Sequence, residues 1–287
     1  MMGVYFTKFT ANDFELYIGR ATAPSGGTNV RVEVPFDLSN YAIFLQVRSY
    51  NLGYLTNSST NDSVHAYIHK IGSNYFEFAI QNLTETSHTS EEVSIIIAKK
   101  GTFTVDGKKI EVFEKTVPAN TWTTVNYPSA FSSNPVIFTT QVSPPHSAVR
   151  LNNISTSSFE INPDSRLESG NERIFILALE PGYYPSLELE VGTVSANHNP
   201  AYKKLSRFYS KPDVLGQIQT YAGPDRCWVR FKEVGHDYIK VCVEETYEHD
   251  GPHATETIGY LVVNNIFYRP FVTYTSRRLE DIYVIIK

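Results

Sequence analysis

The chain has 287 residues, of which 41% are hydrophobic, 13% aromatic and 19% charged, and its formal net charge is -5. This balance is typical of a globular protein, and the length allows one large domain or two to three smaller ones. Because the basic pairs, such as Lys108-Lys109 and Arg277-Arg278, are isolated, no run of charge could follow a phosphate backbone, and we expect no nucleic-acid partner.

Two further classes are not expected. No window approaches the roughly 20 apolar residues of a membrane span, and residues 1–20 lack the apolar region of a signal peptide. With 19 Tyr and 17 Phe against 2 Met, the composition favours strands, so we predict an all-β protein.

Three groups of candidate strands follow one another in chain order, and each has the same order of parts. The first runs through residues 36–50 (FDLSNYAIFLQVRSY), 66–78 and 91–98; the second through 131–142 (FSSNPVIFTTQV), 148–161 and 172–179; the third through 208–221 (FYSKPDVLGQIQTY), 228–241 and 256–263. The match extends upstream, where TVPAN at 116–120 corresponds to TVSAN at 193–197. Gln46, Gln141 and Gln219 align across the copies, so the chain is interpreted as three tandem repeats.

Short segments with alternating apolar positions and no helical spacing predict five or six strands per repeat, packed as two sheets in a small β-sandwich. The predicted boundaries are 1–100 for the first repeat, 101–182 for the second and 183–265 for the third. Because the joints contain few residues, we expect a stiff rod. Residues 266–287 form a strand-like extension, which either folds back on its own chain or adds to the sheet edge of a neighbouring subunit.

The third repeat resembles the H-type lectin-like β-sandwich repeats of bacterial and archaeal surface proteins and viral fibres. The residues that carry this resemblance are Gln217, Gln219, Thr220, Tyr221, Arg230, Glu245, Asp250, Gly251, His253, Glu256, Gly259 and Tyr260. The resemblance covers the second repeat less well and the first least. It implies a six-stranded antiparallel sandwich, often trimeric, that in H-type lectins binds N-acetylgalactosamine-like sugars at subunit edges.

The segment EETYEHDGPHATETIGYLVV at 244–263 contains the densest cluster of carboxylates and imidazoles. His253 and Glu256 in the third repeat recur as His88 and Glu91 in the first, and Glu172 stands alone in the second. A catalytic site would be needed once and not in every repeat, so we expect no enzyme. The recurring pair is interpreted as a structural clasp before the last strand of each repeat.

The surplus polar residues of the third repeat suggest a shallow site that stacks on sugar faces. Its candidate residues are Tyr221, Asp225, Trp228, Arg230, Glu245, Asp250 and His253. No zinc site is expected, because too few ligands lie together. Calcium at the 245–250 loop remains an alternative, since oxygen ligands alone can hold it.

Cys227 and Cys242 lie on two runs joined by a short turn, so they form either a cross-strand disulfide or two free buried thiols. Taken together, the sequence predicts a structural and adhesive part of a virion or extracellular assembly, such as a tail fibre or a capsid-decorating protein. We expect a homo-oligomer, with a trimer favoured, that contacts other assembly proteins and surface glycans. The alternative is a secreted or cell-surface lectin-like carbohydrate-binding protein.

Overall fold

The structure is a computed structural model that describes residues 4–25, 27–50, 64–82, 89–142, 147–165, 170–245 and 253–266. Over these residues it contains 21 strands and two short 3₁₀ turns, so the prediction of an all-β chain is confirmed. No helix in these ranges is long and apolar enough to cross a membrane. His88, Asp250 and the predicted extension after Ile266 lie outside the described residues.

The strands fall into three consecutive groups. The first group contains β1 (Thr7–Ala11), β2 (Phe14–Ala23), β3 (Val30–Glu33), β4 (Tyr41–Val47), β5 (Val64–Ile71), β6 (Tyr75–Asn82) and β7 (Glu91–Lys99). The second group contains β8 (Gly101–Val105), β9 (Lys108–Pro118), β10 (Thr123–Asn126), β11 (Val136–Val142), β12 (Ser147–Asn152), β13 (Ser158–Ser165) and β14 (Asn171–Leu179). The third group contains β15 (Gly182–Tyr184), β16 (Leu189–Ala196), β17 (Ala201–Lys204), β18 (Pro212–Ile218), β19 (Cys227–Val234), β20 (Tyr238–Glu245) and β21 (Glu256–Asn264).

One strand order occurs in every group. The first, second, seventh and fourth strands pair in that order, as in β1-β2-β7-β4, β8-β9-β14-β11 and β15-β16-β21-β18. The third, sixth and fifth strands pair separately, as in β3-β6-β5, β10-β13-β12 and β17-β20-β19. Each group therefore has seven strands rather than five or six. The additional ones are edge strands of three to five residues, too short for their alternation to stand out in the sequence.

Two of the groups begin with a tight hairpin that the sequence dictates. Asn12 and Asp13 join β1 to β2 with φ of 47° and 64°, and Asp106 and Gly107 join β8 to β9 with φ of 51° and 74°. Two consecutive residues with positive φ make a type I′ turn, whose twist matches that of the paired strands. Asn, Asp and Gly are the residues that adopt this conformation at least cost.

The last strand of each group is buried on both faces. In β14, Phe175, Leu177 and Leu179 belong to one core, whereas Ile174 and Ile176 belong to another. One face packs against the three-stranded sheet of the same group, and the other faces the rest of the molecule. This explains why β7, β14 and β21 read as nearly continuous apolar runs instead of alternating ones.

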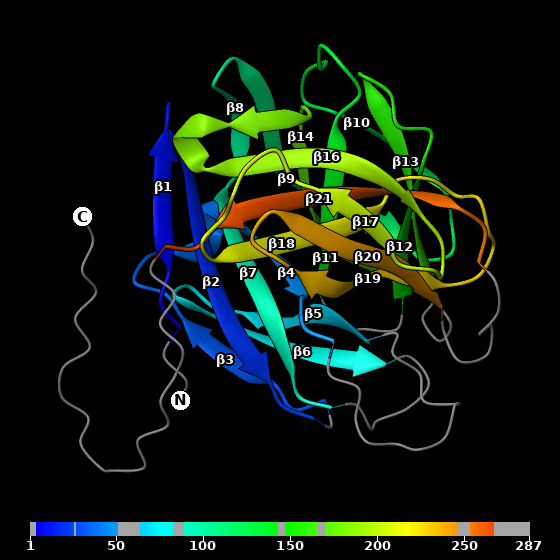
Figure 1. Ribbon diagram of the computed structural model, residues 1–287, viewed down its shortest axis with the longest axis horizontal. Helices are drawn as coiled ribbons and strands as arrows, with labels where there is room; N and C mark the ends of the chain where they lie inside the picture. Colours follow the sequence, from blue (N-terminus) through cyan, green and yellow to red (C-terminus); the bar gives the residue numbers. More distant parts are fainter. Residues whose placement is uncertain are drawn as a thin grey trace.

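The largest core is shared by all three groups, because Ile95 of β7, Leu177 of β14 and Leu261 of β21 all belong to it. The fourth strands of the groups, β4, β11 and β18, each contact the other two. In Figure 1 the second group lies at the top, the third crosses the middle, and the first fills the left and lower side. The expectation of a stiff rod is therefore wrong. The outer faces of the four-stranded sheets are apolar, and they bury one another around a common centre.

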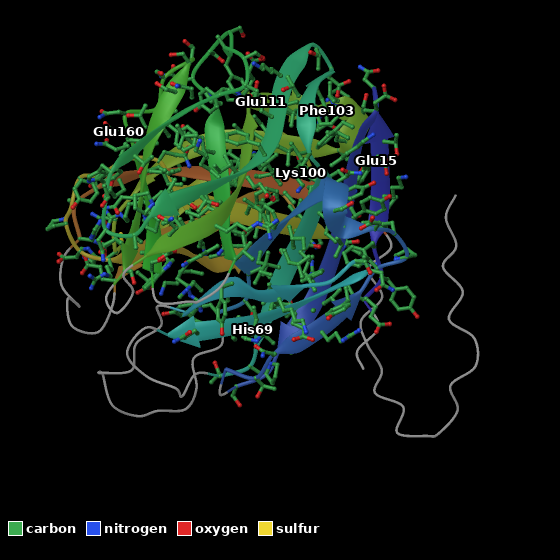
Figure 2. The ribbon with its side chains drawn as sticks, turned by 180° about the vertical axis from the view of Figure 1, so that it is seen from behind. Glu15, His69, Lys100, Phe103, Glu111 and Glu160 are labelled. Carbon is green, nitrogen blue, oxygen red and sulfur yellow. The ribbon has the colours of Figure 1, made fainter. Side chains whose placement is uncertain are left out.

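The first and second groups also touch at their N-terminal hairpins. The Asn12 Nδ2 donates to the Thr104 carbonyl at 2.9 Å, and the Phe14 and Phe103 rings lie 5.0 Å apart. Figure 2 shows Phe103 at this contact, near the strand that carries Glu15. A single parallel residue pair, Val142 with Ile68, further links β11 to β5 and joins strands of both groups into one seven-stranded sheet.

Candidate functional site

The junction of the three groups is built from equivalent positions of the repeat. In the antiparallel ladders Gln46 pairs with Ser94, Thr140 with Phe175 and Gln217 with Gly259. Each of these partners lies three residues after a glutamate at the first or second position of the last strand, namely Glu91, Glu172 and Glu256. The expected alignment of Gln141 and Gln219 with Gln46 is wrong by one and two positions. Matching letters do not set a register, and a shift of one residue turns a side chain to the other face.

These equivalent positions form a cyclic set of hydrogen bonds between the groups. Gln46 Oε1 accepts from the Gly216 N–H at 3.1 Å, and Gln46 Nε2 donates to the Val229 carbonyl at 3.3 Å. Gln217 Oε1 accepts from the Thr139 hydroxyl at 2.7 Å, and Gln217 Nε2 donates to the Val149 carbonyl at 3.0 Å. Thr140 Oγ1 accepts from the Leu45 N–H at 3.1 Å. The first group thus binds the third, the third binds the second, and the second binds the first. The three groups of this single chain therefore have an internal pseudo-threefold arrangement.

Buried ion pairs cross two of the same junctions. Arg230 on β19 is 1% exposed, and its Nη2 lies 2.9 Å from Oε1 of Glu91 in the first group. Arg150 on β12 is 0% exposed, and its Nη2 lies 3.6 Å from Oε1 of Glu256 in the third group. The same nitrogen donates to the Gly223 carbonyl at 2.8 Å. A buried guanidinium is tolerated only when it is paired and hydrogen-bonded in this way.

The third junction replaces the arginine with Tyr67. β5 and β19 have a bulge at the same place, after Ile68 and after Phe231, which makes Tyr67 the counterpart of Arg230. Burial raises the pKa of Tyr67. Glu172, the acceptor expected at this junction, receives hydrogen bonds from Ser147 at 2.8 Å and from Gln141, both in its own group. The described contacts between the first and second groups include the β5–β11 pair, the hydrogen bonds from Leu45 to Thr140 and from Asn12 to Thr104, and apolar packing.

The predicted clasp of the third repeat is a closed cluster inside the molecule. His253 Nδ1 bonds the Glu245 carboxylate, and His253 Nε2 lies 3.3 Å from Glu256 and 3.6 Å from the Cys227 sulfur. The interactions with the Cys227 sulfur and with Glu256 raise the pKa of His253 to about 10, although burial opposes this. The imidazole is therefore a cation held between two carboxylates.

Glu256 also fixes the loop that follows β18. It accepts hydrogen bonds from the Thr220 hydroxyl and from the Ala222 and Gly223 N–H groups at 2.9 and 3.3 Å. Burial raises the pKa of Glu256, but the hydrogen bonds from His253 and Thr220 outweigh it, so the pKa is lowered overall. Glu91 and Glu172 are buried at the equivalent positions.

Cys227, His253 and Glu245 are arranged in the order of a nucleophile, a base and a group that orients the base. The equivalent residue of the second group shows what the position of Cys227 does in the fold. Ser147 begins β12 as Cys227 begins β19, and its hydroxyl donates directly to Glu172. In both groups this first residue of the fifth strand is linked to the glutamate of the last strand, directly in one and through His253 in the other.

The candidate glycan residues do not share one shallow surface. Arg230, Glu245 and His253 are buried, and Trp228 stacks on His65 of the first group with ring centroids 4.7 Å apart and planes 5° apart. Of the described candidates, Tyr221 alone has an exposed ring. Asp225 is half-buried and accepts from Arg150 through its carbonyl. Three of the expected ligand groups are thus committed to contacts inside the protein.

Tyr221 lies on the surface of the junction between the second and third groups. Its ring meets Trp122 edge to face at 5.1 Å and 82°, and the guanidinium of Arg150 lies 4.7 Å from its centroid. An ion pair between Arg226 and Asp164 at 2.9 Å crosses the same junction. This is the part of the predicted glycan site that remains at the surface.

The disulfide expected as one alternative for Cys227 and Cys242 does not form, and both thiols are free and buried. In the β19–β20 ladder Cys227 pairs with Glu245, whereas Cys242 pairs with Arg230. Three ladder positions correspond to about 10 Å along the strands, and an odd separation puts the two side chains on opposite faces. A disulfide needs Cα atoms within about 7 Å and facing side chains.

No group of three or more His, Cys, Asp and Glu side chains in the described ranges is arranged to hold a metal ion. Of the predicted calcium loop, only Glu245 lies in these ranges, and its carboxylate is bonded to His253. A cavity of about 70 Å³ lies where the fourth and fifth strands of the groups meet, lined by Gln46, Gln217 and Trp228 among others. That volume accommodates a few water molecules and no sugar ring.

Sequence reasoning missed the most exposed aromatic side chains of the third group, Tyr202 at 57% and Phe208 at 70% exposure. A signal was present. The third repeat has two adjacent aromatic residues, Phe208 and Tyr209, where the second has only Phe131. Tyr209 is buried as Phe131 is, so the extra ring had to face outward.

Comparison of the chain with models of known protein families gave no match, and comparison with characterised proteins gave none either.

Proposed function

We propose that this chain is a structural and adhesive component of an extracellular or virion assembly, such as a tail fibre or a capsid-decorating protein. The observation that supports it is the cyclic set of hydrogen bonds and buried ion pairs that joins the three groups around one core. Such a junction holds the three groups in one fixed arrangement. A fixed block suits a structural part, and its central cavity of about 70 Å³ is smaller than the roughly 300 Å³ of a typical ligand pocket.

The three groups are proposed to be tandem H-type lectin-like β-sandwiches with boundaries at 1–100, 101–182 and 183–265. Their repeated strand order and their two-layer cores support this reading. In H-type lectins, three separate chains often assemble around an axis. Here one chain supplies three units around a pseudo-threefold centre, and copies of the chain are proposed to associate further through their exposed edges.

A lectin-like carbohydrate-binding protein at a cell surface is the second candidate. The exposed Tyr221, which meets the half-buried Trp122 edge to face, favours it, because an accessible aromatic ring beside charged groups is a surface on which a sugar can stack. Both candidates share an adhesive surface on the third repeat, and they differ in whether the chain builds an assembly.

Native mass measurement of the purified full chain, together with electron microscopy of the same sample, tests the proposal. We expect trimers or larger species with a regular outline. A monomer that persists at high concentration would contradict the assembly role. Retention of that monomer on immobilised glycans would favour the lectin instead.

A further inference from the structure

The exposed Tyr202 and the half-buried Tyr238 form a stacked pair on the three-stranded sheet of the third group. In the β17–β20 ladder Tyr202 pairs with Lys240 and Lys204 with Tyr238, so the two rings are diagonal neighbours on the same face. Their centroids are 5.3 Å apart with planes 26° apart, and Tyr202 is 57% exposed. Tyr238 covers one face of the Tyr202 ring, and the other face is available to a ligand.

Tyr238 is fixed from below and from its edge. A Cβ on Gly235 would lie 2.5 Å from the Tyr238 ring, so the ring rests on the bare glycine backbone. The Tyr238 hydroxyl donates to Glu233 Oε1, and Lys240 Nζ lies 2.7 Å from Glu233 Oε2. The ring, a carboxylate and an ammonium group are thereby held in one arrangement before any ligand arrives.

A second ring pair lies at the tip of the same hairpin. Phe208, 70% exposed, stacks on His236 with centroids 4.9 Å apart and planes 19° apart. His236 Nδ1 donates to the Tyr209 carbonyl at 2.8 Å, so the Nε2 edge of the ring is not used by this bond. The Tyr209 N–H bonds the His236 carbonyl at 2.7 Å, so the loop that carries Phe208 is tied to the hairpin.

We name Tyr202, Phe208, His236 and Tyr238 the aromatic platform. Its chemistry fits a neutral sugar chain. Paired Glu233 and Lys240 cancel in charge yet offer fixed acceptors and donors at the ring edge, which matches the hydroxyl groups of a pyranose. A protein partner is less well matched, because the centre of a protein interface is depleted of charged side chains. Two ring pairs at one hairpin suit two sugar rings of one chain.

We propose that the aromatic platform binds a neutral polysaccharide, with successive pyranose faces on Tyr202 and Phe208 and hydroxyl groups at Glu233, Lys240 and His236. This proposal rests on the adhesive part of the proposed function and assigns it a surface separate from Tyr221. In the first and second groups the contact that Tyr209 makes is made by Leu38 and Phe131, both of which are buried. The residues that precede them are Asp37 and Ala130, so neither group has an aromatic ring at the position of Phe208.

Isothermal titration of the full chain with cellohexaose, chitohexaose and laminarihexaose tests the proposal, with a hyaluronan hexasaccharide as the acidic probe. The double substitution Tyr202→Ala with Phe208→Ala should weaken binding of a neutral probe at least about tenfold, as expected when an anchoring ring is removed. Tyr5→Ala is the matched control, since Tyr5 is 51% exposed on the first group. The Tyr5→Ala variant should bind as the wild type does.

Three results would overturn the proposal: no neutral probe binds, the double variant binds normally, or the hyaluronan fragment binds as tightly as the best neutral probe. Native mass measurement of the double variant separates this outcome from the assembly role. If its oligomer mass changes, the platform is a protein contact and the glycan proposal fails, while the assembly role stands. If mass and glycan binding are both unaffected, the glycan proposal alone fails.

Discussion

The buried pairs of arginine and glutamate side chains lie at the junctions between the groups of strands. Arg150 and Arg230 cross from the fifth strand of one group to the first residue of the last strand in the next, where Glu256 and Glu91 accept them. Because water is excluded there, the loss of one partner leaves the other charge buried without its counter-ion. The cost of removing one partner exceeds the net worth of the pair.

Arg230→Met should lower the free energy of unfolding by about 3–5 kcal/mol, because Glu91 would lose the guanidinium that balances its buried charge. Urea unfolding monitored by tryptophan fluorescence measures this. Adding Glu91→Gln to the same variant should restore a large part of the loss. Arg173→Ala, which removes an exposed pair with Glu114, is the control and should stay near the wild type. Equal losses in both single variants would contradict a special role for the buried pair.

His253 makes stability fall on the alkaline side. Its folded pKa of about 10 lies above the ordinary value of 6.5, so its contribution is complete below pH 6.5 and is lost as the pH rises through 10. Unfolding free energies of the wild type and of His253→Gln should therefore differ most near pH 6 and converge near pH 10.5. A difference that stays constant between these pH values would show that the imidazole is neutral in the folded protein.

Two glycines are required in the strands and turns for two different reasons, close approach of strands in one case and a positive φ in the other. Gly259 in β21 has ordinary backbone angles, but a Cβ there would lie 2.4 Å from Val136 of β11. Gly107 in the β8–β9 turn has nothing within 4 Å of such a Cβ, but its φ is +74°. The first glycine allows two groups to approach, and the second allows a chain to turn.

Asparagine distinguishes these two roles, since it tolerates positive φ but has a side chain that needs room. Gly107→Asn should change the free energy of unfolding by well under about 1 kcal/mol, whereas Gly259→Asn should cost about 1–3 kcal/mol or more through overpacking of the junction. Chemical denaturation of the two variants measures the difference. If Gly107→Asn were the more damaging, the junction would not be as tightly packed as the distances indicate.

At the scale of the whole molecule, the largest hydrophobic core is built from residues of all three groups. Ile95, Leu177 and Leu261 reach it from three different last strands, and the burial of each such side chain contributes about 1.5–3 kcal/mol. A group on its own would expose the outer face of its four-stranded sheet. Stability is therefore shared among the repeats and is not the sum of three independent folds.

Calorimetric unfolding of the full chain should give a single transition, with a calorimetric enthalpy close to the van't Hoff value. The reason is that the loss of any one group uncovers the core of the other two. A fragment of residues 183–266 should lack the sharp thermal transition of the full chain. Three separable transitions, or a cooperatively folded fragment, would show that the groups are independent.

Much of this architecture could be read from local patterns. The alternation within β12, β13 and β19, the apolar runs of β7, β14 and β21, and the Asn12-Asp13 and Asp106-Gly107 turns all follow from short-range chemistry, so strands and repeats were predictable. The position of Glu91, Glu172 and Glu256 at the start of the last strand was predictable for the same reason. The role assigned to these glutamates and the buried environment of Arg230 and His253 were not.

Local sequence patterns and tertiary contacts act over different distances along the chain, and this separates what was predictable from what was not. Periodicity and turn residues act over a few positions, so the sequence alone determined an all-β chain with a repeat and a clasp position in each copy. The faces that meet depend on contacts between residues such as Gln46 and Val229, or Arg150 and Glu256, which are more than 100 residues apart. Only the tertiary structure could decide that the repeats close around one centre, because that choice comes from burying three outer faces at once.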